Sequence, residues 1–223
     1  MQPLPPSFFD RPTLEVAPDL LGRLLVHEHP DGTLLTGRIV ETEAYTQDDP
    51  AFHGWGIVDV ETGLIKPDGR GYDLFARPGT SYVYLIYGMY WLLNVVTERE
   101  GVGGAVLIRA VQPNTGIDAM FGRRPAARKE TDLASGPGKL AQAFDLDGSH
   151  HGMPLTERPL YFSDDPDGEL CSVTTSCRIG ITRGVDLPWR FYIDGNPHVS
   201  PGVPSDIAAE ERRRRRNQST NRR

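Results

Sequence analysis

The stretch "GRIVETEAY" at residues 37–45 places two glutamates and a tyrosine at every second position. Alternation along a β-strand would put Ile39, Glu41, Glu43 and Tyr45 on one face, and the small and aliphatic residues between them on the other. Because the second set suits a core, the carboxylates are expected to face solvent or a cleft, about 6 to 7 Å apart. Two such carboxylates can flank a glycosidic bond, one as acid or base and the other stabilising an oxocarbenium-like centre. An exposed polar face gives the same pattern.

A run of aromatic residues, "SYVYLIYGMYWLLNVV" at residues 81–96, predicts two strands that reverse at Gly88. Tyr82 and Tyr84 share one face, where packing in a core would also explain them. Tyr87 lies beside the reversal, at the tip of a protruding hairpin, and is poorly placed for a core. A tyrosine there could act as a wedge between stacked bases, as large side chains of minor-groove proteins do.

Two cationic positions also stand out. Arg109 lies in the otherwise apolar "AVLIRAVQP", and a buried arginine needs an anion, either in the core or at a site. Residues 135–140, "SGPGKL", are typical of a helix start, with Ser135 as cap and Pro137 in the first turn. Gly138 and Lys139 would bring free amides and a cation to a phosphate, although an ordinary helix start needs nothing more.

The histidines and cysteines predict no metal site. His27 and His29 would face one way on a strand, but no third ligand lies nearby in the sequence. His53, eight residues after Tyr45, could bend back over the carboxylate face. The two cysteines are separated by five residues, which is not a zinc-site spacing. The histidines expected at the surface are His27, His29, His150, His151 and His198.

The elements that must position these residues follow from the sequence pattern. A helix is predicted in "PTLEVAPDLLG", and a hairpin over residues 23–45. Residues 50–79 are largely polar and predict a long loop, with a short extra hairpin around "VETG". Further strands are predicted in "GAVLIRAVQP", "PLYFSD", "CRIGITR" and "WRFYIDG", and helices in "TGIDAMFGRR" and "GPGKLAQAF". Without a repeat or regular βαβ alternation, the fold class is α+β: one compact domain with a curved mixed, mainly antiparallel, sheet and packed helices.

Charge is distributed unevenly along the 223 residues. Seven of the 24 Lys and Arg lie in residues 212–223, which contain no acid, so residues 1–211 carry 17 positive against 30 negative side chains. We expect a domain over 1–205 and a basic, flexible tail over 206–223. The tail fits a nucleic-acid arm or a merely solvated terminus. Because the sequence has neither a run of about 18 apolar residues nor a signal-peptide start, we expect an intracellular protein that spans no membrane.

Seven segments, in order, resemble the alkyladenine (3-methyladenine, methylpurine) DNA glycosylase family, from about Phe8 to Ser200. The segments are "FFDRP", "LLGRLLV", "PDGTLLTGRIVETEAY", "PGTSYVYLIYGMYWLLNVV", "AVLIRAVQP", "SGPGKLAQA" and "RFYIDGNPHVS". The resemblance implies a monofunctional base-excision enzyme that flips alkylated or deaminated purines out of duplex DNA and hydrolyses the N-glycosidic bond. Lesions of the 3-methyladenine, 7-methylguanine, hypoxanthine and ethenoadenine class are implied. So is a single domain without a helix-hairpin-helix. It further implies a monomer without cofactor or metal, cytoplasmic in a bacterium or nuclear in a eukaryote.

The resemblance also assigns roles to individual residues. Glu43 would be the general base that activates water, with Arg109 and the backbone carbonyl of Ile179 helping to hold that water. Tyr87 would intercalate where the nucleotide has left, and Asn94 would guard the pocket floor, where a purine amino group is rejected. The residues that would sandwich the flipped base are Tyr45, His53 and Tyr84. Glu41 has no role in the resemblance, and a bulge beside the site would break the strand alternation.

Some features depart from the family pattern. Residues 54–77 replace the usual "TPRN" segment and Met-Phe pair, and the loop after Tyr45 is one residue shorter, which leaves the position of His53 and the substrate range open. The arginine tail is also outside the pattern. Two alternatives therefore remain: a non-catalytic module that binds damaged DNA, and a carbohydrate hydrolase that uses Glu41 and Glu43.

Overall fold

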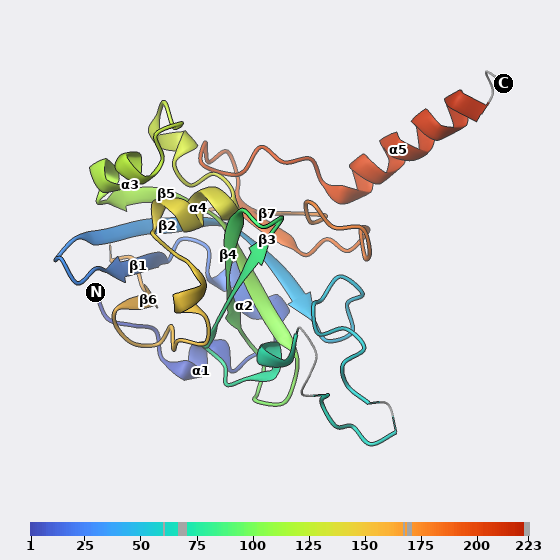
Figure 1. Cartoon of the computed structure of the whole chain (residues 1–223), viewed down its shortest axis with the longest axis horizontal. Coiled ribbons are helices and arrows are strands. Elements are labelled where there is room, and N and C mark those ends of the chain that lie inside the picture. Colours follow the sequence, from blue (N-terminus) through green and yellow to red (C-terminus); the bar gives the residue numbers. More distant parts are fainter. Residues whose placement is uncertain (60, 67–70, 167, 169–170, 221–223) are drawn as a thin grey trace.

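The computed structural model describes residues 1–59, 61–66, 71–166, 168 and 171–220. Their secondary structure forms a single α+β domain around one curled sheet (Figure 1). Six strands follow in the order β3-β4-β5-β2-β1-β6. A hairpin of β7 and β8 joins this sheet at β2. Every pairing among the described strands is antiparallel, which confirms the mainly antiparallel sheet expected from the sequence. The strands are β1 (Leu24–Glu28), β2 (Leu34–Thr46), β3 (Ser81–Ile86), β4 (Tyr90–Val96), β5 (Gly104–Thr115), β6 (Leu160–Ser163), β7 (Val173–Ser176) and β8 (Arg190–Ile193).

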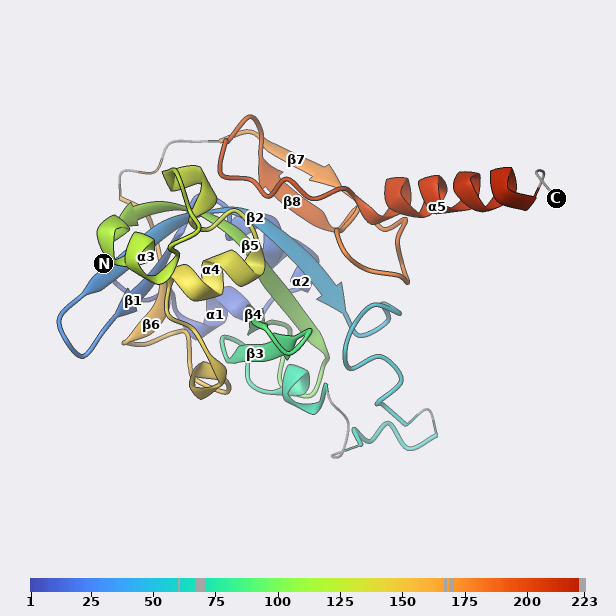
Figure 2. The same cartoon turned by 45° about the horizontal axis from the view of Figure 1, so that its top comes forward.

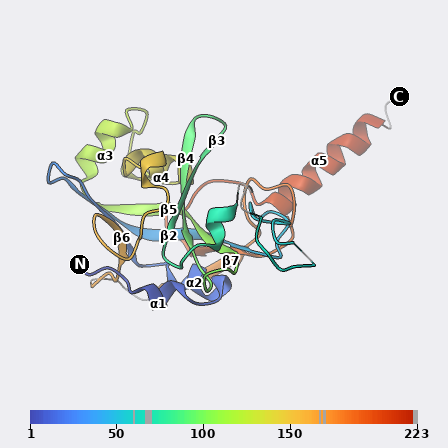
Figure 3. The same ribbon diagram turned by 60° about the horizontal axis from the view of Figure 1, so that its bottom comes forward.

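Helices cover both faces of the sheet. Figure 3 shows α1 and α2 on one side and α3 and α4 on the other, with the β3–β4 hairpin standing up beside α4. Helix α2 packs on β2, β5 and β8, and α4 packs on β4 and β5. The sheet is therefore buried on both faces along its middle strands, and β1 is buried along nearly its whole length. The α-helices are α1 (Pro6–Phe9), α2 (Thr13–Asp19), α3 (Ile117–Arg123), α4 (Pro137–Ala143) and α5 (Ser205–Thr220).

The central strand β2 changes partner at the two glutamates. Its first half pairs with β1, and residues 41–43 pair with β8. Its pairing with β5 shifts register twice around Glu41, so Val40 in β2 and Arg109 in β5 have no direct partner. The expected bulge is confirmed. Because a bulge re-aims side chains locally, the strict alternation predicted over residues 37–45 breaks at this point.

The loop between β2 and β3 forms its own small core at one end of the sheet. Phe52 and Phe75 pack with Tyr82, and their rings lie 6.0 Å apart, edge to face. Gly54 and Gly71 approach so closely that a Cβ on Gly71 would overlap the Gly54 backbone. The short extra hairpin is confirmed as one isolated bridge between Val58 and Ile65. Part of "VETG", residue 60, lies outside the described residues.

Several predicted elements are corrected by the structure. The strand predicted in "CRIGITR" was wrong, because β7 ends at Ser176 and the following residues turn inward to bury Arg178. The first predicted helix ends at Asp19, with Pro18 inside its last turn. Residues 205–220 form helix α5, which projects from the domain (Figures 1 and 2). The flexibility expected of this tail stays a prediction. Within the described part of the chain, none of the helices is both long and apolar enough to cross a membrane.

Candidate active site

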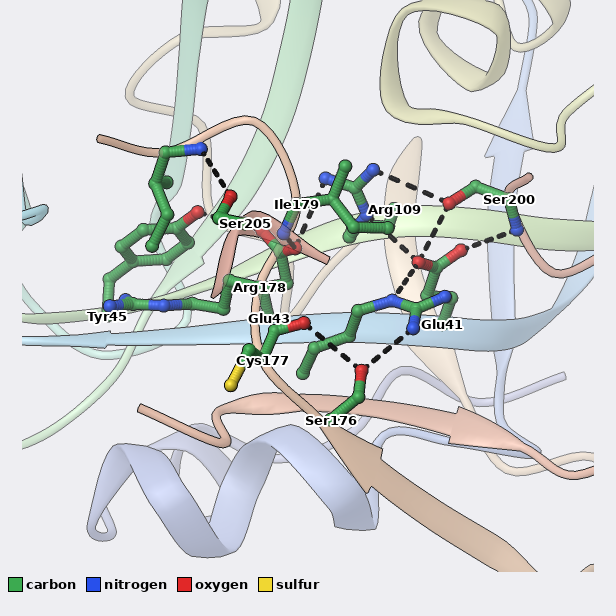
Figure 4. A network of polar contacts seen from close by, with 12 residues as sticks. Glu41, Glu43, Tyr45, Arg109, Ser176, Cys177, Arg178, Ile179, Ser200 and Ser205 are labelled. Atoms are coloured by element: carbon green, nitrogen blue, oxygen red, sulfur yellow. Dashed lines mark hydrogen bonds and ion pairs between the residues drawn. The ribbon is translucent and has the colours of Figure 1, made fainter. Parts of the chain in front are cut away.

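Glu41 and Glu43 lie at the bulge of β2, and both side chains are completely buried. The exposure expected for them was therefore wrong. Glu41 accepts hydrogen bonds from Nε of Arg109 at 3.0 Å and from Nε of Arg190 at 2.6 Å. It also accepts the amide and hydroxyl of Ser200, at 2.7 and 2.8 Å (Figure 4). Four donors hold this carboxylate, which makes Glu41 the counter-charge of two buried arginines and not a second catalytic carboxylate.

Glu43 has fewer partners, and they differ in kind. Its Oε1 accepts the backbone amide of Ile179 at 2.7 Å and lies 3.3 Å from the Arg109 guanidinium. Its Oε2 accepts the hydroxyl of Tyr45 at 2.8 Å. Since a carboxylate oxygen can accept two hydrogen bonds, Oε2 keeps capacity for one more donor. The three described residues that bond or pair with this carboxylate, Tyr45, Ile179 and Arg109, also line a cavity, so the carboxylate lies directly behind the cavity wall.

Arg109 links the two carboxylates, as expected of a buried arginine that needs an anion. Burial lowers the pKa of its guanidinium, but the adjacent charges of Glu43 and Glu41 outweigh this, and the pKa is raised. Burial and the Glu43 charge raise the pKa of Tyr45 well above its ordinary value. Tyr45 therefore remains a neutral phenol that donates to Glu43, and Arg109 remains a cation.

A further buried arginine, Arg178, was missed by sequence reasoning. Its guanidinium pairs with Asp49, donates to the carbonyl of Ala44 at 3.0 Å, and lies over the ring of Tyr45 with 4.5 Å between its central carbon and the ring centroid. The same guanidinium also lies over the ring of Trp189, with 5.2 Å between its central carbon and the ring centroid. Arg178 thus joins the segment that contains Ile179 to strand β2. The available signal was an arginine next to aliphatic residues in "CRIGI", as in "VLIRAV".

The cavity in front of Glu43 has a volume of about 770 Å³, and its lining includes five tyrosines, Phe52 and His53. His53 lies against two of the tyrosines, with Nδ1 3.2 Å from the Tyr82 hydroxyl and its ring 4.6 Å from the centroid of Tyr84. The loop over residues 47–80 therefore brings His53 back over the pocket, as the sequence suggested. Asn94 lies on the adjacent strand, where it is buried and donates to the carbonyl of Tyr82 at 3.1 Å. The structure brings together all four predicted base-pocket residues, Tyr45, His53, Tyr84 and Asn94.

Tyr87 occupies the tip of the β3–β4 hairpin, beside the cavity. Its side chain is 81% exposed, and its backbone has a φ of 54°, an uncommon conformation for a large side chain. Gly88 follows with a φ of 66°, so the two residues form the turn that reverses the chain. Met89 is 63% exposed. An apolar tip held out in water suggests a partner that the chain itself does not supply.

The start of helix α4 lies against Tyr90, the first residue of β4, next to the turn of this hairpin. The cap predicted at Ser135 was wrong, because Gly136 is the N-cap, and the hydroxyl of Ser135 instead accepts from Nζ of Lys139 at 3.2 Å. A Cβ at Gly138 would lie 3.0 Å from Tyr90, which leaves little room for a side chain at this position. Arg124 was not predicted and adds a third cation to the cavity lining, beside Arg109 and Lys139.

The remaining histidines are only partly at the surface. His27 and His198 are buried, at 4% and 7% exposure, so the surface position predicted for these two was wrong. The other three are intermediate. Both cysteines are free thiols. The described residues contain no cluster of His, Cys, Asp or Glu arranged to hold a metal.

A cavity lined by five tyrosines, backed by a buried carboxylate and flanked by an exposed tyrosine, is the arrangement expected of enzymes that act on a nucleic-acid base. Comparison with known sequences gives the family. The model of the methylpurine-DNA glycosylase (MPG) family matches residues 7–197, and the chain belongs to this family.

Curated relatives cover nearly the whole chain. A protein of Salinibacter ruber named "Putative 3-methyladenine DNA glycosylase" is 58% identical over 206 residues, which cover 92% of this chain and all of the relative. Proteins with the same name from Chlorobium luteolum and Methanocella arvoryzae are 45% and 44% identical. They cover 89% and 93% of this chain, and 97% and 100% of their own lengths. The protein is thus a DNA-3-methyladenine glycosylase, a hydrolase of base excision repair that acts on alkylated purines in DNA.

Proposed function

We propose that Glu43 is the general base of this glycosylase and activates the water that displaces a damaged purine from its deoxyribose. The observation that carries the proposal is the arrangement around Glu43. Its Oε2 accepts a single hydrogen bond from the described residues, and its three contacting residues open onto the cavity. A water bound there could pass a proton to the carboxylate as the glycosidic bond breaks. The backbone carbonyl of Ile179 and the Arg109 guanidinium are the proposed further ligands of that water.

The cavity walls support a preference for purines that carry positive charge. Alkylation at N3 or N7 makes a purine cationic and a better leaving group, and tyrosine faces attract a cation. In the proposed complex, Tyr45, His53 and Tyr84 enclose the flipped base. The buried amide of Asn94 limits which exocyclic groups fit. Neutral lesions such as hypoxanthine and ethenoadenine belong to the proposed range, where shape must replace charge.

At the mouth of the cavity, the proposed DNA contacts are Tyr87, Gly138 and Lys139. Tyr87 takes the space left by the flipped nucleotide, which offsets the lost stacking, and Lys139 with the amide of Gly138 binds a nearby phosphate. One chain supplies every residue named in this scheme, so the proposed active form is the monomer.

The proposed range is tested by base release from duplexes that carry 3-methyladenine, 7-methylguanine, hypoxanthine or ethenoadenine. We expect release of every base, fastest for the cationic ones. Glu43→Gln should keep the affinity for lesion DNA but release base about 10² to 10⁴ times more slowly. Glu157→Gln, which changes an exposed glutamate in the same way, is the matched control. Full activity of Glu43→Gln would remove Glu43 from the mechanism, and release of only one lesion would narrow the range.

A further inference from the structure

Helix α5 (Ser205–Thr220) lies beyond the region that the family model matches, which ends at residue 197. It contains five consecutive arginines, residues 212–216, in a chain whose first 211 residues carry 17 positive and 30 negative side chains. An acidic body repels the phosphates of DNA, so cations gathered at one place matter for binding. The helix is therefore the strongest cationic segment that the site described above leaves without a role.

The start of α5 is hydrogen-bonded to the segment that lines one side of the cavity. The amide of Ser205 donates to the carbonyl of Arg178 at 2.8 Å, and its hydroxyl accepts the amide of Ile181 at 3.1 Å. Pro204 pairs with Ile179 in an isolated bridge. Ile179 is the residue whose amide holds Glu43. The same short segment thus positions both the proposed catalytic base and the first turn of α5.

Beyond this anchor, the helix leaves the body of the protein. Ser205 is 2% exposed, whereas Ile207 is already 48% exposed, and residues 210–214 are all exposed. In Figure 3 the tip of the β3–β4 hairpin and the far end of α5 project to the same side, the top of the view. A duplex that meets the hairpin tip therefore lies on the side toward which helix α5 extends.

We propose that α5 binds the phosphate backbone of duplex DNA a few base pairs from the flipped nucleotide. The inference rests on the base-flipping function proposed above, because the hairpin and cavity fix where the DNA lies. At 1.5 Å per helical residue, the arginines begin about 10 Å from Ser205 and end about 16 Å from it. For a duplex that meets the cavity beside Ser205 and runs along α5, with about 3.4 Å between successive pairs, this distance corresponds to about three to five base pairs.

The charges within α5 favour a contact of this kind. Arginines at spacings of three and four residues repel one another on a helix. Glu210 offsets part of that repulsion through its ion pair with Arg214 at 2.5 Å. Phosphates along a groove edge would neutralise the remaining arginines. Binding of DNA should therefore also raise the helix content of α5, whereas a solvated terminus would leave it unchanged.

The test uses the full chain with residues 212–216 changed together from Arg to Gln. A second variant, with the same five residues changed to Lys, keeps the charge and is the matched control. Affinity for a lesion-free 25-base-pair duplex is measured by fluorescence anisotropy from 50 to 200 mM KCl. Affinity falls as the salt concentration rises from 50 to 200 mM. If the Gln variant loses three phosphate contacts, its fold loss of affinity over this range should be about 40 times smaller than that of the wild type. The Lys variant should behave as the wild type does, and base release at saturating enzyme should be unchanged in both.

Duplexes of unequal flanks locate the contact. Each flank of a lesion duplex is trimmed in turn from ten to three base pairs. Trimming the flank that α5 contacts should weaken wild-type binding and leave the Gln variant unaffected, whereas trimming the other flank should affect both proteins equally. Equal salt dependence of wild-type and Gln variant, or loss of salt dependence in the Lys variant as well, would overturn the proposal. These measurements test DNA binding and not base release. The proposed chemistry is tested independently, and it is wrong if the wild type releases no base.

Discussion

The guanidinium of Arg178 lies over the ring of Tyr45, with 4.5 Å between its central carbon and the ring centroid. Tyr45 in turn donates to Glu43, and the neighbouring Ile179 donates to the other oxygen of the same carboxylate. One buried arginine thus touches the residues on both sides of the proposed base. Asp49, itself 1% exposed, holds this arginine through two hydrogen bonds.

Arg178→Lys should slow base release more than it weakens binding. Lysine can still pair with Asp49, but it has no planar group to lie on Tyr45 and no fork of donors to hold both oxygens of Asp49 together with the carbonyl of Ala44. A displacement of Tyr45 or Ile179 by about 1 Å could lower the single-turnover rate by about 10²-fold. The measurement is single-turnover base release at saturating enzyme, with Arg183→Lys, an exposed arginine nearby, as control. An unchanged rate, with unchanged affinity, would contradict a positioning role.

Glu41→Gln should destabilise the fold strongly. The change leaves Arg109 and Arg190 buried beside a neutral amide, and breaking a buried pair from one side costs about 3 to 5 kcal/mol. Glu43→Gln is the matched comparison, because Arg109 then keeps Glu41 as its partner and the loss should be smaller. Urea unfolding followed by circular dichroism gives the free energy of unfolding for each. Equal stability of the two variants would show that Glu41 is not the main counter-charge.

Tyr87→Asn should separate stability from function. Asparagine tolerates the positive φ of this position better than tyrosine does, so the free energy of unfolding should not fall and could rise by about 1 kcal/mol. Base release from a normally paired lesion should slow, because the wedge is lost. A lesion opposite a mismatched base, which is cheaper to flip, should lose less. Equal slowing on both duplexes would contradict a wedge role for Tyr87.

His27 should make the fold sensitive to acid. Burial lowers its pKa to about 4, although its Nδ1 donates to the carbonyl of Phe144, and His29 and His150 lie against its ring. In the unfolded chain a histidine titrates near 6.5, so the unfolded state takes up the proton first as the pH falls. Stability is therefore full above about 6.5 and declines toward pH 4, by at most about 1.4 kcal/mol per pH unit from this residue.

The check is urea unfolding of wild-type and His27→Asn at pH 7, 6, 5 and 4.5. Asparagine can place an N–H toward Phe144 but does not titrate, so the variant should lose less stability on acidification. His198, whose pKa burial also lowers, contributes to both proteins and cancels in the difference. Parallel pH profiles would assign the acid sensitivity to other groups.

Local patterns were enough to predict the hairpins and most strands. The run over residues 81–96 gave both strands and their turn, because its apolar density and Gly88 are properties of neighbouring residues. The residues that the resemblance assigns to a base pocket line one cavity, and their role there stays a prediction. The exposure predicted for Glu41 failed because its partners come from β5 and from residues 190–200, far along the chain.

The same limit explains the other errors. Arg178 lies 129 residues from Asp49 in sequence, so no local pattern pairs them. His27 is buried because its ring lies against His150 and its Nδ1 bonds the carbonyl of Phe144, both far along the chain. The burial of charge in this protein depends on contacts between residues far apart in the sequence. Glu41 and Glu43, which the pattern placed on an exposed face of a strand, are buried in the protein.

Gly138 leaves room for the β3–β4 hairpin because it has no side chain. Tyr90 packs against its bare backbone, and a methyl group there would meet the tyrosine at 3.0 Å. Tyr90 pairs with Ile86 immediately before the turn, so any outward shift at Tyr90 would also move Tyr87, three residues away, and change the direction of its side chain. The start of α4 thus supports the hairpin, and the direction in which Tyr87 points depends on the absence of a side chain at Gly138.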